Sequence, residues 1–129
     1  MKLDAVGVVS TDLSKTITFY KLLGFSFGEL TSDGKHVESE PSEGFARLMI
    51  DTQDVIEAII GETPRPGNHS SFAVNYSSPD EVDDVVKKVA ESGFMVVKEP
   101  WDAFWGQRYA VVEDPDGYKV DLYAQLENH

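Results

Sequence analysis

The chain of 129 residues contains no cysteine. Disulfide bonds and thiolate chemistry are therefore excluded, and a reducing cytoplasm is the expected location. Long hydrophobic runs are missing too. The N-terminal segment MKLDAVGVVSTDL carries a charge at Asp4, and its apolar run is too short for a signal peptide or a membrane span.

Basic residues are scarce: 11 Lys and Arg stand against 23 Asp and Glu, which gives a formal net charge of −12. Such a chain is repelled by phosphate backbones and by anionic membranes, so neither nucleic acid nor a membrane is an expected partner. Two interpretations of the charge stay open. It keeps the protein dissolved, or it attracts a cationic ligand to an acidic cleft.

Familiar catalytic motifs are absent as well. The sequence has no glycine-rich phosphate loop, no Gly-x-Ser-x-Gly and no cysteine nucleophile. Ser70 and Ser71 follow His69, but adjacency in sequence is no evidence for a catalytic triad. His36 lies in a polar segment and His129 is the last residue, so we expect neither to bind a metal.

What the chain does contain is an order of elements that occurs twice. Residues 1–60 and residues 69–126 each read as a strand, a helix, a Gly-Phe pair and three further strands, and the Pro- and Gly-rich residues 61–68 (GETPRPGN) form a linker. With 41% hydrophobic residues, the chain can bury one shared core. We predict a single α+β domain of two βαβββ modules, whose curved, U-shaped sheet surrounds a cavity and carries the helices on its outer face.

Capping signals locate the two helices. Asp12 is suited to cap the first, and Gly24 to end it in a left-handed conformation. Ser78, followed by Pro and by a glutamate three residues on, is a strong start for the second helix, and Gly93 ends it.

The final strand expected in each module carries a carboxylate between apolar residues. These strands are residues 55–60, containing Ile-Glu-Ala, and residues 119–123, containing Val-Asp-Leu. Because alternate side chains of a strand point to opposite faces, we expect Glu57, Asp121 and Tyr123 to face the cavity. The alternative is that both carboxylates are solvated at strand ends.

Residues 101–108 (WDAFWGQR) form an expected loop in which aromatic side chains gather. Its aromatic candidates for ligand binding are Trp101, Phe104 and Trp105. Such rings stack on flat apolar groups and on cations, although they can equally seal one end of a cavity. Arg108 can hold an anionic group of a ligand, or pair with Asp114 or Glu113.

The first module supplies further candidates for the cavity wall. Phe45, Arg47 and Met49 are alternate residues of one expected strand. Their side chains should therefore point to one face of the sheet, and those of Leu48 and Ile50 to the other face. A methionine there gives an adaptable apolar surface.

Three segments resemble a known superfamily. VGVVSTDLSKTITFYKLLGF, FAVNYSSPDEVDDVVKKVAESGF and EDPDGYKVDLY are similar to segments of the vicinal oxygen chelate superfamily, which includes glyoxalase I, bleomycin-resistance proteins and extradiol dioxygenases. The resemblance implies paired βαβββ modules around a U-shaped cavity, usually in a homodimer. It also implies a chemistry that depends on whether four metal-ligand positions are filled.

The resemblance assigns those four positions to Ala5, Glu57, His69 and Asp121. Glu57, His69 and Asp121 together offer a set that can hold a divalent ion such as Zn, Ni, Mn or Fe. Ala5 offers no ligand, and Asp121 is one methylene shorter than the glutamate of metal-dependent members. His69 can also be an exposed residue of the linker.

Three functions remain open from the sequence. The first is a small-molecule-binding protein, similar to the bleomycin-resistance branch, which sequesters its ligand without a metal in an aromatic-lined cavity. The second is a metal-dependent isomerase or lyase of glyoxalase type that uses Glu57, His69 and Asp121. The third is a structural or regulatory dimer. Extradiol dioxygenation is disfavoured because those enzymes usually carry more modules.

Overall fold

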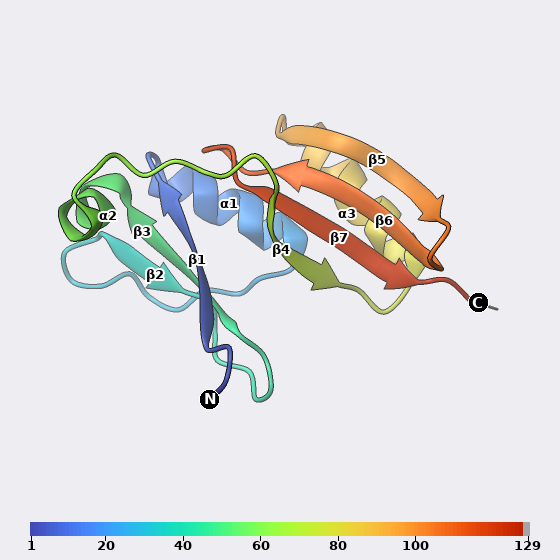
Figure 1. The fold of residues 1–129 in the computed structure, drawn as a ribbon, viewed down its shortest axis with the longest axis horizontal. Helices are drawn as coiled ribbons and strands as arrows, with labels where there is room; N and C mark the ends of the chain where they lie inside the picture. The colour runs from blue at the N-terminus through green and yellow to red at the C-terminus, as the bar shows by residue number, and fades with distance from the viewer. Residues whose placement is uncertain (128–129) are drawn as a thin grey trace. The chain divides into compact units, whose positions relative to one another are not determined.

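The computed structural model describes residues 1–127, so His129 lies outside the described residues. The chain divides into two compact units, Met1–Arg65 (unit 1) and Pro66–His129 (unit 2), and the division falls within residues 61–68. The described residues contain three helices and two sheets, an α+β composition (Figure 1). None of the helices in residues 1–127 combines the length and the apolar character that a bilayer span requires.

Unit 1 is built on a three-stranded sheet in the order β1-β3-β2. Strand β1 runs parallel to β3, and β2 runs antiparallel to β3. Its elements are β1 (Ala5–Ser10), α1 (Leu13–Leu23), β2 (His36–Glu38), β3 (Arg47–Thr52) and α2 (Gln53–Ile60).

Unit 2 is built on a four-stranded sheet in the order β4-β7-β6-β5. Strand β4 runs parallel to β7, while the other neighbours are antiparallel, and α3 lies along one face of this sheet (Figure 1). Its elements are β4 (Ser70–Asn75), α3 (Pro79–Glu91), β5 (Met95–Ala103), β6 (Gln107–Glu113) and β7 (Lys119–Gln125).

The predicted capping residues are confirmed. The side chain of Asp12 accepts a hydrogen bond from the backbone N–H of Lys15, and that of Ser78 accepts one from the N–H of Glu81. Gly24, with φ of 112°, ends α1 in the left-handed region that glycine adopts without strain.

The alternation of side chains in the sheets is as the sequence predicts. In unit 1, Leu48 and Ile50 of β3 are fully buried. In unit 2, Val120 and Leu122 of β7 are fully buried, and Val82, Val86 and Val89 of α3 are buried. Residues between these positions on the same strands are only partly buried, so each sheet has one core face and one face of mixed polarity.

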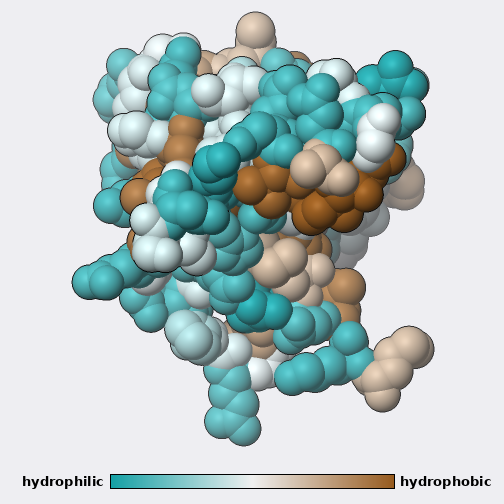
Figure 2. Space-filling model, turned by 90° about the vertical axis from the view of Figure 1, so that its left-hand side faces the viewer, coloured by the Kyte–Doolittle hydropathy of each residue, from teal (hydrophilic) through white to brown (hydrophobic). Residues whose placement is uncertain are grey.

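The prediction of a strand at residues 55–60 is wrong, because this segment is helix α2. Its apolar residues recur at a helical spacing, Asp54 places a negative charge in the first turn, and Gly61 ends the helix with φ of 80°. No residue of α2 is buried, and Ile59 and Ile60 are strongly exposed. The side of unit 1 that carries α2 shows apolar side chains gathered between hydrophilic ones (Figure 2).

Two other expectations about local structure need correction. The aromatic segment is not a loop: β5 continues to Ala103 and β6 begins at Gln107, so only three residues form the turn between them. Gly106 makes this short turn feasible with φ of 91°. The strand expected after Phe25 is reduced to an isolated bridge between Phe27 and Ser39.

Candidate ligand-binding site

The face of the unit 2 sheet opposite α3 carries the candidate site. On β6, Ala110 and Val112 are fully buried, and Arg108, which shares their parity, reaches Asp83 of α3. The alternate residues, Tyr109 on β6 and those of its parity on β7, therefore lie on the face away from the helix.

Aromatic rings line up across this face. The register pairs Trp101 of β5 with Tyr109, and Tyr109 with Tyr123 of β7. The ring centroids are 5.6 Å apart for Trp101 and Tyr109, and 5.8 Å apart for Tyr109 and Tyr123, whose rings are stacked. Trp105 from the turn lies edge-on to both Trp101, at 6.0 Å, and Tyr109, at 5.4 Å. These four residues are called the aromatic face.

The rings are partly accessible. Trp105 is 45% exposed, and Phe104, which contacts Trp105 with a centroid distance of 5.1 Å, is 90% exposed. Aromatic surface that is not fully used in the core has area left for an incoming ring.

A carboxylate is held at the edge of the aromatic face. Asp121 accepts hydrogen bonds from the hydroxyls of Ser70 and Tyr109. Burial, and then the hydrogen bond to Asp121, raises the pKa of the Tyr109 hydroxyl. Tyr109 is therefore a protonated hydrogen-bond donor to Asp121 at neutral pH.

A lysine lies over one of the rings. The ammonium of Lys98 is 5.0 Å from the centroid of the Trp101 ring, which is cation–π distance. The aromatic face of unit 2 thus has an acidic group, Asp121, beside Tyr109 and a basic group, Lys98, beside Trp101.

Arg108 is not brought to the aromatic face. Its guanidinium donates to Asp102 on β5 and, at 2.7 Å, to Asp83 on α3, so it lies on the helix side of the sheet. Both carboxylates raise the pKa of the Arg108 guanidinium and keep it charged. The structure gives Arg108 neither of the partners weighed from the sequence, Asp114 and Glu113, as an ion pair.

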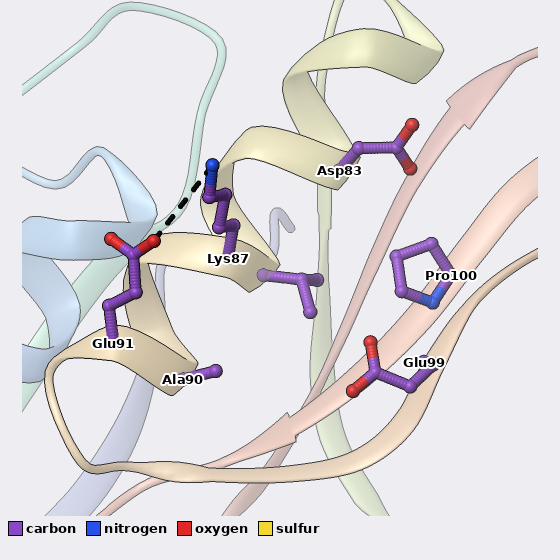
Figure 3. Close-up of a pocket in the computed structure, with 7 residues that line it drawn as sticks. Asp83, Lys87, Ala90, Glu91, Glu99 and Pro100 are labelled. Atoms are coloured by element: carbon purple, nitrogen blue, oxygen red, sulfur yellow. Dashed lines mark ion pairs between the residues drawn. The ribbon is translucent and has the colours of Figure 1, made fainter.

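A groove also lies on the helix side, between α3 and β5 (Figure 3). It has a volume of about 470 Å³. Its lining residues are Asp83, Val86, Lys87, Ala90, Glu91, Glu99 and Pro100. Lys87 and Glu91 form an ion pair at its rim, as Figure 3 shows, and none of the candidate residues from the sequence lines it.

The candidates from unit 1 lie in a different chemical setting. Arg47 donates to Asp4 and Glu38, each at 2.6 Å, and Met49 follows two residues later on β3 with the same parity. Phe45 is 75% exposed in the segment before β3.

An ion-pair network extends from Arg47 across the unit 1 sheet. His36 is on strand β2, not in a loop, and lies between Asp51, 2.6 Å from its Nδ1, and Glu38, 2.9 Å from its Nε2. The bond to Asp51, and then the bond to Glu38, raises the pKa of the His36 imidazole. Arg47 also contacts Glu38, so charged groups dominate this face of unit 1.

The three metal-ligand candidates occupy unlike places. Glu57 is on helix α2, where its carboxylate accepts from the Thr63 hydroxyl at 3.1 Å. His69 precedes β4, is exposed, and donates from Nδ1 to the carbonyl of Ser70 at 2.9 Å. Asp121 is bound by two hydroxyls. Residues 1–127 contain no group of three or more His, Cys, Asp or Glu side chains placed to hold a metal ion.

The pairing of strands also corrects the match between Glu57 and Asp121. Strand β3 pairs in parallel with the first strand of unit 1, as β7 does with the first strand of unit 2, so β3 is the counterpart of β7. Asp121 is opposite Ala73, and the corresponding residue of β3, opposite Gly7, is Met49. A methionine thioether and the Ala5 methyl are poor ligands for a hard divalent ion, so these positions do not fit a metal centre of the expected kind.

Sequence reasoning missed three residues of the site: Ser70, Lys98 and Tyr109. Alternation around Ala110 and Val112 was enough to indicate Tyr109. Ser70 and Lys98 had no such signal, because both lie at shifts in strand register.

Two sheets built from a repeated strand–helix–strand unit, with partly exposed aromatic rings on one of them, make up this small domain. The family model "Glyoxalase/Bleomycin resistance protein/Dioxygenase superfamily" matches residues 2–122, and the chain belongs to this superfamily. Members of the superfamily bind small-molecule ligands, often use divalent metals and often form dimers. Among proteins with curated descriptions, none matches the chain.

Solved structures share the fold at low sequence identity. A hypothetical protein from S. aureus is 23% identical with a TM-score of 0.80, and the match covers 96% of this chain and 94% of that one. A glyoxalase-related enzyme from Fulvimarina pelagi is 16% identical, with a TM-score of 0.82 and coverage of 97% and 88%. Lactoylglutathione lyase from Agrobacterium tumefaciens is also 16% identical, with a TM-score of 0.70 and coverage of 95% and 92%.

Proposed function

We propose that this chain is a metal-independent small-molecule-binding protein that sequesters a planar aromatic ligand on the aromatic face of unit 2. The observation that carries the proposal is the row of rings from Trp101 through Tyr109 to Tyr123, with Trp105 edge-on to it and 45% exposed. A planar ligand gains ring contacts there without a large rearrangement, because the rings are already ordered by strand pairing.

Independence from a metal is supported by the donor groups. Both oxygens of Asp121 accept hydrogen bonds from hydroxyls, and Met49 and Ala5 supply no oxygen or nitrogen side-chain ligand. Calorimetric titration with nickel, zinc, manganese and iron(II) should show no binding tighter than about 0.1 mM, or roughly −5.5 kcal/mol. A tight site, weakened by Glu57→Gln or Asp121→Asn, would instead favour a metal-dependent isomerase or lyase.

The two tryptophans give a direct assay, because both Trp residues of the chain belong to the aromatic face. Each contributes one indole N–H signal to a proton–nitrogen NMR spectrum. Titration with planar aromatic compounds should shift both signals, and a ligand at 100 times its dissociation constant should stabilise the protein by about 2.7 kcal/mol. Indole signals that stay unchanged across a broad library of such compounds would contradict the proposal.

Sequestration is distinguished from turnover by recovering the ligand. After prolonged incubation with the protein, mass spectrometry should find the ligand unchanged. A product that forms with wild-type protein but not with Asp121→Asn would show catalysis at this face.

A homodimer completes the proposal. Dimers are frequent in the superfamily, and the exposed Ile59 and Ile60 of α2 provide apolar surface of the kind found in subunit interfaces. Light scattering should give twice the mass of the chain, and the pair of substitutions Ile59→Glu and Ile60→Glu should halve it. If the wild-type protein is a monomer, the proposed homodimer is wrong, but the proposal of ligand binding is not affected.

A further inference from the structure

The path of strand β5 brings Lys98 onto the aromatic face. Lys98 and Trp101 are three residues apart, so in a regular strand they would point to opposite faces of the sheet. The pairing with β6 shifts register between Val96 and Lys98 and again between Lys98 and Trp101. These irregularities place Lys98 opposite Val111 and bring its ammonium over the Trp101 ring. Bulges that redirect a side chain in this way are frequent beside functional sites.

The charge of Lys98 is available to a ligand. Within residues 1–127, no carboxylate lies at ion-pairing distance from its ammonium, and its observed contact is the Trp101 ring. Lys119, the other lysine on this face, is paired with Glu113 at 3.3 Å. Of these two lysines, only Lys98 therefore has a charge that no acidic side chain of residues 1–127 neutralises.

The acidic group of the same face is already engaged. Asp121 accepts from Ser70 and Tyr109, and the raised pKa of Tyr109 keeps its donated proton in place. Hydroxyl donors already occupy one lone-pair site on each oxygen of this carboxylate, whereas the Lys98 ammonium has three N–H donors and its observed contact is the Trp101 ring.

We infer that the aromatic face takes a planar aromatic ligand that carries an anionic group, such as a carboxylate, with the ring on Trp101, Trp105 and Tyr109 and the anion at Lys98. This inference rests on the proposed function and narrows it to one class of ligand. It also reverses the expectation of a cationic ligand that the net charge of −12 suggests.

Three naphthalene probes of equal size test the inference: 2-naphthoate, 2-naphthylmethanol and 2-naphthylmethylammonium. Dissociation constants are measured from the indole N–H signals of the two tryptophans at constant ionic strength. We expect 2-naphthoate to bind about three- to tenfold more tightly than the ammonium probe, the range that one partly exposed charge contact gives. The overall negative charge of the protein opposes this order, so non-specific attraction does not produce it.

The decisive variant is Lys98→Met, which keeps most of the side-chain length and removes the charge. It should abolish the preference for 2-naphthoate while leaving the affinity for 2-naphthylmethanol within about twofold. Lys87→Met is the matched control, because it changes net charge equally but lies on α3, on the other side of the sheet. It should leave the preference intact.

The outcomes separate the inference from the proposed function. Binding of all three probes with equal affinity, tighter binding of the ammonium probe, or an unchanged preference in Lys98→Met would overturn the inference alone. Absence of any indole shift with all three probes would overturn both. A loss of preference in Lys87→Met equal to that in Lys98→Met would show a general charge effect and would also overturn the inference.

Discussion

In each of the two sheets a central strand has a parallel neighbour on one side and an antiparallel neighbour on the other, but the sheets differ in the side chains on the face that does not pack on the core. On β3 of unit 1 and β7 of unit 2, buried apolar residues alternate with exposed or half-buried ones in the same positions relative to the parallel partner strand. The half-buried positions of unit 1 carry the Arg47 and His36 ion pairs. Those of unit 2 carry stacked aromatic rings.

This difference shows that packing constrains only half of each strand. A residue on the core face must be apolar and of the right volume, because the interior is close-packed. A residue on the other face is free to differ, and in this protein one unit uses that freedom for charge and the other for rings. The candidate site lies in unit 2 for this reason.

The length of the hairpin adds to the contrast. Strands β5 and β6 of unit 2 have nine and seven residues, whereas β2 of unit 1 has three. The longer hairpin extends the sheet far enough to place Trp101 and Trp105 beside Tyr109. Unit 1 instead continues from β3 into helix α2, and the segment after α1 forms only one bridge.

The largest expected effect concerns the core positions that both units share. Ile50→Ala and Leu122→Ala should each lower the free energy of unfolding by about 2–5 kcal/mol, because both side chains are fully buried and leave a cavity. Denaturant unfolding of the two variants measures this. Met49→Ala and Val111→Ala, on the other faces, should each cost less than half as much. Equal costs for Met49 and Ile50 would break the distinction between core face and free face in unit 1.

Ligand binding should depend on unit 2 alone. Trp101→Ala should weaken binding of a planar aromatic ligand by about ten- to a hundredfold, or roughly 1.4–2.7 kcal/mol, because it removes one end of the ring row. The matched variant in unit 1 is Phe45→Ala, which removes a 75% exposed ring and should leave the affinity unchanged. A comparable loss in both variants would mean that the two units share the site.

The hydroxyl of Tyr109 should contribute through Asp121. Tyr109→Phe keeps the ring and removes one hydrogen bond to the carboxylate, so we expect a loss of about 1 kcal/mol in the free energy of unfolding. Tyr123→Phe is the control, because the Tyr123 ring stacks on Tyr109 but its hydroxyl makes no hydrogen bond to Asp121. If the two variants are equally stable, the bond between Tyr109 and Asp121 contributes nothing measurable.

The smallest effect is a pH dependence from unit 1. Asp51 and then Glu38 raise the pKa of His36 above its ordinary value, so the folded protein binds a proton more tightly than the unfolded chain does. This stabilisation is fully present below a pH of about 6.5, the unfolded pKa of histidine, and is lost as pH rises through the folded pKa. The melting temperature should therefore fall as pH rises through that interval, and His36→Gln should flatten the slope. An identical slope in wild type and His36→Gln would show that other groups set the pH dependence.

Much of the fold follows from local signals in the sequence. The helix caps at Asp12 and Ser78 and the apolar alternation of β3 and β7 depend on neighbours within a few residues, and these predictions are confirmed. The same reasoning gave a wrong prediction for residues 55–60, which form a helix and not a strand. In this short apolar stretch, Ile-Glu-Ala looks like strand alternation, while the spacing of its larger side chains fits a helix equally well.

The site was harder to predict because its members come from different strands. Trp101, Trp105 and Tyr123 were expected from the sequence, but Arg108 was grouped with them only because it is close in sequence. Arg108 and Tyr109 are adjacent on β6, so their side chains point to opposite faces of the sheet. The guanidinium of Arg108 therefore reaches Asp83 on the helix side.

Composition, the repeated order of elements and the caps determine from sequence alone that this is an acidic, cysteine-free α+β protein of two related units. Only the tertiary structure decides which side chains share a surface. Strand register depends on long-range hydrogen bonds, and the shifts on either side of Lys98 leave no trace in local propensity. Those shifts bring the Lys98 ammonium to the Trp101 ring, and this contact is the basis for the proposed preference for an anionic ligand.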